Sequence, residues 1–256
     1  ALITRNPVAF RHARRGPNRH KHRMTYVLHY APDNASLIIR LALDHLGLPY
    51  RDQLVDRAAQ GQRSKAYLAL NPNGLIPVLE TPQGPVFETG AILLWLGDTH
   101  GGLGPLPQDA ARADYLKWLF YTANTLHPAL RMLFYPEKYI GADAGHQAAL
   151  RAGLHGQIDA ALALLDQLAA TGPAWLGSDS PTGLDFNIAA CLRWCALYPA
   201  NAPRDWFVPA RYPALMQMAA GLEALPATHM LQTAEGLGPT PFPAPVYVNP
   251  PHGSAT

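Results

Sequence analysis

Hydrophobic positions in the first half of the chain change their period several times, and each change predicts an element. Alternation at residues 26–30 predicts a strand, and the apolar stripe over residues 36–46 predicts a helix closed by a glycine. Apolar stretches at 52–55, 76–80 and 85–87 predict further strands. A four-residue turn of Thr, Pro, Gln and Gly separates the last two, which are therefore expected to pair antiparallel. The order βαβ followed by ββα predicts an α/β domain with a mixed sheet.

Helical periodicity dominates the second half of the chain. It begins after the segment HGGLGPLPQDA, whose Gly and Pro content interrupts the earlier pattern. One helix is expected to start near Thr182, because Thr182 and Asp185 form a variant capping box. The apolar stripes contain Tyr115, Leu116, Leu119, Phe120 and Ala123, then Leu150, Leu154, Ile158, Ala161, Leu162 and Leu165, and finally Ile188, Cys191, Leu192 and Cys195. This half therefore predicts an all-α C-terminal domain.

Composition shifts mark the expected domain boundaries. Residues 24–100 are expected to form the α/β domain, residues 101–110 a linker, and residues 111–235 the all-helical domain. Residues 236–256 are rich in Pro and Gly, which predicts an irregular tail.

The basic character of the chain is concentrated at its start. Residues 1–23 hold seven of the twenty Lys and Arg and no acid, and they lack a usable hydrophobic period. The segment is expected to be a disordered basic extension, or upstream translation before a start at Met24. Nucleic-acid binding and a targeting address are the alternatives, and no nucleic-acid partner is expected.

The composition, at 48% hydrophobic and 15% charged over 256 residues, is typical of a globular protein. No apolar run reaches the roughly 18 residues that span a bilayer, and no secretory signal is recognised, so a cytoplasmic protein without membrane contact is expected. Cys191 and Cys195 match no zinc spacing and lie one turn apart on an apolar stripe. They are interpreted as core residues, and no metal is expected.

Several motifs together resemble those of the glutathione transferase family. NPNGLIPVLE is similar to the family's turn and strand with a cis proline, ETGAILLWL to its Glu-Ser-x-Ala-Ile helix start, and WLGSDSPTGLDFNIAACLRW to its capped interior helix. LHYAPDNASL, NTLHPALRMLFYP and AEGL most resemble the bacterial beta class. The resemblance covers Met24 to about Leu237. It implies a thioredoxin-like first domain, glutathione as co-substrate, and a cytoplasmic homodimer with a role in detoxification.

Glutathione has chemical requirements that named residues of this chain can meet. Its γ-glutamyl end carries an ammonium and a carboxylate, which Glu88 and Thr89 at a helix start could hold, although a plain helix cap is the alternative. The resemblance implies that Pro77 follows a cis bond and that the backbone of Ile76 pairs with the cysteinyl residue of glutathione. Leu75 replaces the Gln often found there in the beta class.

Activation of glutathione requires that its thiol, with a pKa near 8.5, be stabilised as a thiolate. The position of the beta-class cysteine falls on Ala35, so mixed-disulfide chemistry is not expected there. Ser36 is the first candidate for the sulfur's hydrogen-bond donor, and Tyr30, Asn34 and backbone N–H groups are alternatives. The resemblance implies that His127 approaches the sulfur as a protonated or donating imidazole.

The rest of the expected site is less defined by the sequence. The beta-class Lys that binds the glycyl carboxylate aligns near Gln60, so Arg57 or Arg63 is the expected substitute. The expected function is that of a glutathione transferase, which conjugates the glutathione thiolate to a small hydrophobic electrophile or uses it to reduce such a substrate or a peroxide. The aromatic residues Tyr121, Phe134 and Tyr135 are the candidates for the pocket of this second substrate. The alternative function is a glutathione-binding or apolar-ligand-binding protein without significant turnover.

Overall fold

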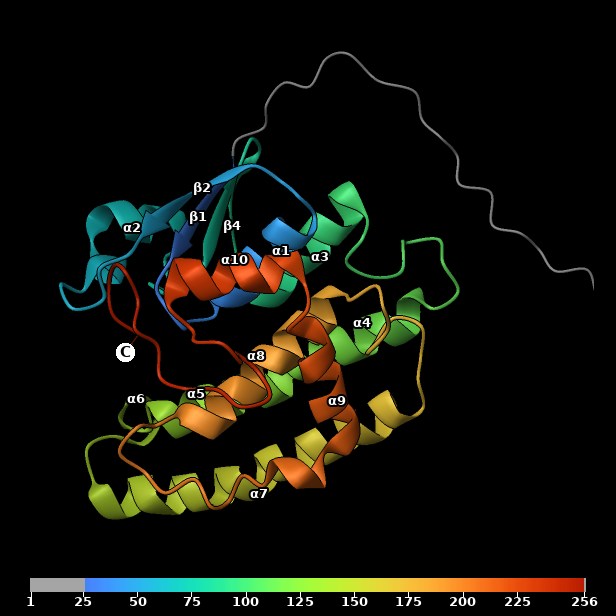
Figure 1. Ribbon diagram of the computed structural model, residues 1–256. Helices are drawn as coiled ribbons and strands as arrows, with labels where there is room; N and C mark the ends of the chain where they lie inside the picture. Colours follow the sequence, from blue (N-terminus) through green and yellow to red (C-terminus); the bar gives the residue numbers. More distant parts are fainter. Residues whose placement is uncertain (1–25, 256) are drawn as a thin grey trace, which may run out of the picture.

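The computed structural model describes residues 26–255, so the basic segment 1–23 lies outside the described residues. Four strands form one mixed sheet in the order β2-β1-β3-β4 (Figure 1). These strands are β1 (Tyr26–Tyr30), β2 (Tyr50–Leu54), β3 (Val78–Thr81) and β4 (Gly84–Phe87). β1 pairs parallel with β2 and antiparallel with β3, and β3 pairs antiparallel with β4. The predicted mixed sheet is confirmed.

Helices cover both faces of this sheet. On one face, α1 (Ser36–His45) and α3 (Thr89–His100) pack against each other, and α1 also packs on β1. Successive side chains of β3 point to opposite faces, so Leu79 joins the main core while Val78 packs with Tyr67. Tyr67 belongs to α2, which spans Lys65–Leu70 and follows a short 3-10 turn at Gly61–Arg63. This arrangement places α2 on the face opposite α1.

The helical unit is built around α8 (Gly183–Leu197), which is buried along almost its whole length. The capping box of Thr182 and Asp185 that the sequence predicts is present at its start. Around it lie α4 (Arg112–Tyr121), a π-helical turn (Thr122–Leu126), α5 (His127–Phe134), α6 (Glu137–Ile140), α7 (Ala144–Ala170), a 3-10 turn (Pro209–Arg211) and α9 (Pro213–Leu222). Cys191 and Cys195 are free and fully buried, as core residues should be. No helix in residues 26–255 combines the length and the apolarity needed to cross a membrane.

The last helix returns to the sheet domain. α10 (Pro226–Glu235) packs against α1, as Figure 1 shows, although it follows the helical unit in sequence. The buried carboxylate of Glu235 accepts hydrogen bonds from Arg40 Nε at 3.0 Å and from the backbone N–H of Asp33 at 2.9 Å. α10 therefore stabilises the turn that follows β1 through these hydrogen bonds.

The tail after α10 forms neither helix nor strand over the described residues to 255. It runs beside α8, where Arg193 donates to the carbonyls of Pro241 and Val246 at 2.9 and 3.0 Å. Near its end, the Ala255 carbonyl accepts from Arg57 at 2.7 Å. The tail therefore makes hydrogen bonds to both the helical unit and the sheet domain.

A buried ion pair joins the two units. Arg193 of α8 donates through Nε and Nη2 to the two carboxylate oxygens of Asp33, at 2.8 and 2.9 Å, and both side chains are fully buried. Trp194 and Tyr198 donate to the same carboxylate at 3.0 and 2.7 Å. Removing one partner of such a pair leaves a buried charge uncompensated, which is far more costly than losing an exposed ion pair.

We expect Arg193→Met to lower the free energy of unfolding by about 3–5 kcal/mol, because the Asp33 carboxylate would stay buried without its counter-charge. Urea denaturation measures this loss. The control is Arg211→Met, which removes a half-exposed ion pair with Asp159 and should cost less than about 1 kcal/mol. Equal losses in the two variants would contradict a joining role for the buried pair.

Candidate functional site

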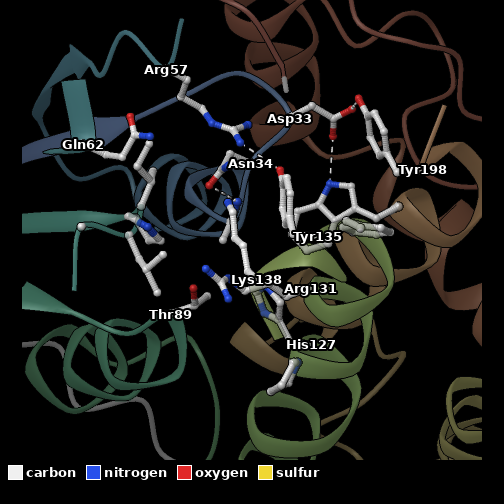
Figure 2. Close-up of a pocket in the computed structure, with 18 of the residues that line it drawn as sticks. Asp33, Asn34, Arg57, Gln62, Thr89, His127, Arg131, Tyr135, Lys138 and Tyr198 are labelled. Carbon is white, nitrogen blue, oxygen red and sulfur yellow. Dashed lines mark hydrogen bonds between the residues drawn. The ribbon is translucent and has the colours of Figure 1, made fainter. Parts of the chain in front are cut away.

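A cavity of about 530 Å³ lies between the two units. The sheet domain contributes the turn after β1, the segment between β2 and α2, the segment before β3 and the start of α3. The helical unit contributes α5, α6, the end of α8 and the residues that follow it. Figure 2 shows side chains from both units pointing into this space. Among the predicted glutathione residues, the cavity is lined by Asn34, Leu75, Ile76, Pro77, Glu88 and Thr89.

The segment before β3 lines the cavity through Gly74, Leu75, Ile76 and Pro77. The bond between Ile76 and Pro77 is cis, as the family resemblance implies. The carbonyl of Leu75 accepts hydrogen bonds from the Tyr67 hydroxyl at 2.8 Å and from Asn71 Nδ2 at 2.9 Å. These two bonds fix the chain from the α2 side, so Ile76 is held in place at the cavity wall.

Glu88 and Thr89 occupy the junction of β4 and α3. Glu88 has φ of 72°, a left-handed conformation that a residue with a side chain adopts only at some cost in energy. It stands at the N-cap position, yet its side chain makes no capping hydrogen bond. The carboxylate is therefore not used as a helix cap, and it is available to a ligand beside the first N–H groups of α3.

The turn after β1 places Asn34 and Ala35 at the cavity, next to the start of α1. Asn34 Oδ1 accepts a hydrogen bond from the backbone N–H of Ala35 at 2.8 Å. This bond assigns the oxygen of the amide, which leaves Nδ2 as a donor to a ligand. The buried Asp33 before it is fixed by its bonds to α8.

Two predicted catalytic residues do not line the cavity. The hydroxyl of Ser36 is fully buried, where it donates to the Ala31 carbonyl at 3.0 Å and accepts from the Ala31 N–H at 3.2 Å. Tyr30 is 6% exposed, and its ring packs 4.5 Å from the guanidinium of Arg40. Burial raises the pKa of its hydroxyl, with Asp52 adding to the effect. Ser36 fastens the turn, because a side chain in the first helical turn leans back toward the residues before it.

His127 does line the cavity, from the first residue of α5. Burial lowers the pKa of its imidazole to about 4, and the nearby Arg131 guanidinium lowers it further in the same direction. Its ring lies 5.3 Å from that of Trp194, with the planes tilted by 46°. At neutral pH the imidazole is uncharged, so it can act only through one N–H or one lone pair. The protonated form considered from the sequence is incorrect for this environment.

The sequence interpretation missed two basic residues at the cavity, Arg131 and Lys138. Arg131 follows His127 by four positions on α5, a spacing that puts both on one face of a helix and could have indicated it. Lys138 enters from α6, beyond a turn, and no periodic pattern points to it. Of the three aromatic candidates, Phe134 and Tyr135 line the cavity and Tyr121 does not.

Arg57 and Arg63, the expected substitutes for a glycyl-binding lysine, both line the cavity. Arg57 also donates to the Tyr135 hydroxyl at 2.9 Å, so it links the sheet domain to the helical unit. Within the described part of the chain, no group of three or more His, Cys, Asp or Glu side chains is placed to hold a metal ion.

Comparison with known proteins agrees with this geometry. Residues 35–99 match the family model described as glutathione S-transferase, N-terminal domain, and residues 148–217 match the corresponding C-terminal domain. The glutathione S-transferase GST-4.5 of Xanthomonas campestris is 32% identical over 176 residues, 65% of this chain and 81% of that protein. The maleylacetoacetate isomerase of Rhizobium meliloti is 30% identical over 213 residues, 80% of this chain and 95% of that protein.

Solved structures give the same result. A sphingomonad glutathione S-transferase complexed with glutathione superposes with a TM-score of 0.67 at 27% identity, over 83% of this chain and 100% of that one. A glutathione transferase of Burkholderia graminis, with two glutathione molecules bound per subunit, superposes with a TM-score of 0.69 at 26% identity, over 84% of this chain and 90% of that one. By its sequence relatives, its fold and its cavity, the chain belongs to the glutathione S-transferase family of glutathione-dependent enzymes.

Proposed function

We propose that this chain binds glutathione in the cavity and activates its thiol for attack on a small electrophile. The observation that carries the proposal is the convergence of Glu88, Thr89 and the backbone of Ile76 with the start of α1 on one cavity. Glu88 and Thr89 bind the charged γ-glutamyl end of the tripeptide, the backbone of Ile76 pairs with its peptide backbone, and the start of α1 faces its thiol. The relatives named as glutathione S-transferases, and the glutathione-bound structures, support this assignment.

The γ-glutamyl end of glutathione fits the junction of β4 and α3. The carboxylate of Glu88 pairs with the ammonium, and the Thr89 side chain with the first N–H groups of α3 holds the carboxylate. The cysteinyl backbone extends along Ile76 as an added strand would. The glycyl carboxylate then lies toward Arg57 and Arg63.

This direction brings the sulfur to the start of α1, where the sequence has Ala35 in place of a cysteine. Asn34 Nδ2 is the side-chain donor that the geometry favours, in place of Ser36 or Tyr30. A hydrogen bond to an anion contributes roughly 1.5–3 kcal/mol, and a helix N-terminus adds up to about 2 kcal/mol. Together they lower the thiol pKa by about one to four units. His127 can add one further N–H donor in its neutral form.

An isomerase is the second candidate for the reaction, favoured by the coverage of the Rhizobium meliloti protein named maleylacetoacetate isomerase. In such a reaction the thiolate adds to a double bond and leaves again, so glutathione is regenerated. A transferase consumes one glutathione per turnover. The same activated sulfur serves both. Measuring glutathione consumption against product formation separates the two reactions, and a protein that only binds glutathione shows neither product.

Assembly, location and subclass follow from the family resemblance and are part of the proposal. The chain is proposed to act as a cytoplasmic homodimer in detoxification, and its assignment to the beta class stays a prediction.

We predict that Glu88→Gln weakens glutathione binding by about ten- to a hundredfold, because it removes the charge that faces the ammonium and keeps the size of the side chain. Isothermal calorimetry on the purified chain measures the affinity. The control Asp179→Asn removes an exposed carboxylate elsewhere and should leave the affinity unchanged. If Glu88→Gln binds glutathione as tightly as the control does, the ammonium of bound glutathione does not face Glu88 and the proposed orientation is wrong.

We predict that Asn34→Ala raises the pKa of the bound glutathione thiol by about one unit, since the thiolate loses one hydrogen bond. The measurement is thiolate absorbance near 240 nm as a function of pH, with the enzyme saturated by glutathione. Ser36→Ala is the comparison variant, and a urea unfolding curve shows whether it keeps its fold. A rise in thiol pKa in a folded Ser36→Ala, with none in Asn34→Ala, would reverse the choice of donor.

A further inference from the structure

Basic side chains outnumber the available acids in the cavity. Arg57 and Arg63 line it from the sheet domain, and Arg131 and Lys138 line it from the helical unit. Asp33 and Glu88 are the acidic residues in the wall, but the Asp33 carboxylate is already neutralised by its buried partner Arg193. Glu88 is therefore the one cavity carboxylate, among residues 26–255, that is left to offset four positive charges.

Three of the four cations, Arg57, Arg131 and Lys138, contact neutral groups. No ion pair involves them among the described residues. Arg57 donates to the Tyr135 hydroxyl and to the carbonyl of Ala255. The Lys138 ammonium lies 4.1 Å from the centre of the Tyr135 ring, and Arg131 donates to the Tyr139 hydroxyl.

The pKa of Lys138 reflects both its burial and the neighbouring cations. Burial lowers the pKa of its ammonium, and Arg131 lowers it further, while Glu137 opposes the shift. Arg57 and Arg63, from the other side of the cavity, also lower it. Cations on both walls of the cavity are thus close enough to influence one another. Figure 2 shows Arg57, Arg131 and Lys138 around the cavity.

Glutathione, placed as proposed above, accounts for only part of this charge. In that placement the ammonium of glutathione pairs with Glu88, and its γ-glutamyl carboxylate binds at Thr89 and the start of α3. Its glycyl carboxylate pairs with the arginines of the sheet domain. Arg131 and Lys138, both on the helical unit, have no counter-charge from the tripeptide backbone. They stand beside Phe134 and Tyr135, on the wall where a second substrate would lie.

On the basis of that proposed glutathione placement, we propose that the second substrate is an anionic electrophile, a molecule whose carboxylate is bound by Arg131 and Lys138. Its apolar part contacts Phe134 and Tyr135, while its reactive carbon faces the sulfur at the start of α1. A carboxylate between a guanidinium and an ammonium gains charge-assisted hydrogen bonds and steering from the positive walls. This replaces the small hydrophobic electrophile expected from the sequence.

The test compares 4-chloro-3-nitrobenzoate with 4-chloro-3-nitrobenzamide, which have nearly the same shape and differ in charge. In each reaction the glutathione thiolate attacks the ring carbon that carries chlorine. A C–S bond forms, the C–Cl bond breaks, chloride leaves with the electron pair, and the thiol proton passes to solvent. For each compound, kcat/KM is divided by the rate constant of its uncatalysed reaction with glutathione. This correction removes the difference in intrinsic reactivity between the two compounds.

We expect the corrected kcat/KM to favour the carboxylate by at least about tenfold, and this preference to shrink as salt rises from about 50 to about 500 mM. Arg131→Gln and Lys138→Met should each reduce the preference by about three- to tenfold. Lys117→Met, an exposed charge removal on α4 outside the cavity, should keep the preference of the unmodified chain.

Calorimetry with the two conjugates, S-(4-carboxy-2-nitrophenyl)glutathione and S-(4-carbamoyl-2-nitrophenyl)glutathione, repeats the comparison without turnover. The carboxylate conjugate should bind more tightly, and the margin should fall in Arg131→Gln and Lys138→Met. If glutathione binds but the two conjugates bind equally, the anionic electrophile is excluded while the proposed function stands. If glutathione itself does not bind, both proposals fail. An equal loss for both conjugates in the two variants would show that these cations serve glutathione, which also overturns the inference.

Discussion

The buried pair of Asp33 and Arg193 is the contact on which the cavity depends. Asp33 lies in the turn between β1 and α1, directly before the residues that face the glutathione sulfur in the proposed complex, and Arg193 lies in the most buried helix of the helical unit. Each carboxylate oxygen receives two hydrogen bonds, so the cost of burying the charge is offset by a complete set of partners. The pair fixes both the turn and the position of the two units.

The same contact explains the electrostatic character of the cavity. Because Arg193 neutralises Asp33, this carboxylate does not offset the cations that line the walls. His127 adds no positive charge, since burial and Arg131 keep its imidazole neutral. The cavity therefore combines one carboxylate for an ammonium with a surplus of guanidinium and ammonium groups. A tripeptide with a net negative charge and an anionic electrophile both fit that balance.

Much of the fold was predictable because its signals are local. Strand alternation, the hairpin turn and the capping box of Thr182 and Asp185 each depend on residues within a few positions of one another. The cavity wall formed by NPNGLIPVLE and ETGAILLWL was predictable for the same reason, because each motif lies in one short stretch of sequence. The sequence could not show which of Asn34 and Ser36 lines the cavity, because the two residues are only two positions apart. Which hydroxyl or amide faces the cavity depends on the course of the turn: Ser36 bonds to Ala31, while Asn34 bonds to the next N–H.

The order of elements, the cap of α8 and the residues proposed to meet the two charged groups at the γ-glutamyl end could all be read from the sequence. The tertiary structure decided which charges meet. Asp33 and Arg193 are 160 positions apart, and Arg57, which belongs to a different unit, helps to lower the pKa of Lys138 through its charge. The physical reason is that a charge acts through its distance to other charges and to water, and folding sets both of these quantities between residues that are far apart in sequence. Local patterns record which side chains a segment carries, and only packing assigns them a partner, a protonation state and a place in the site.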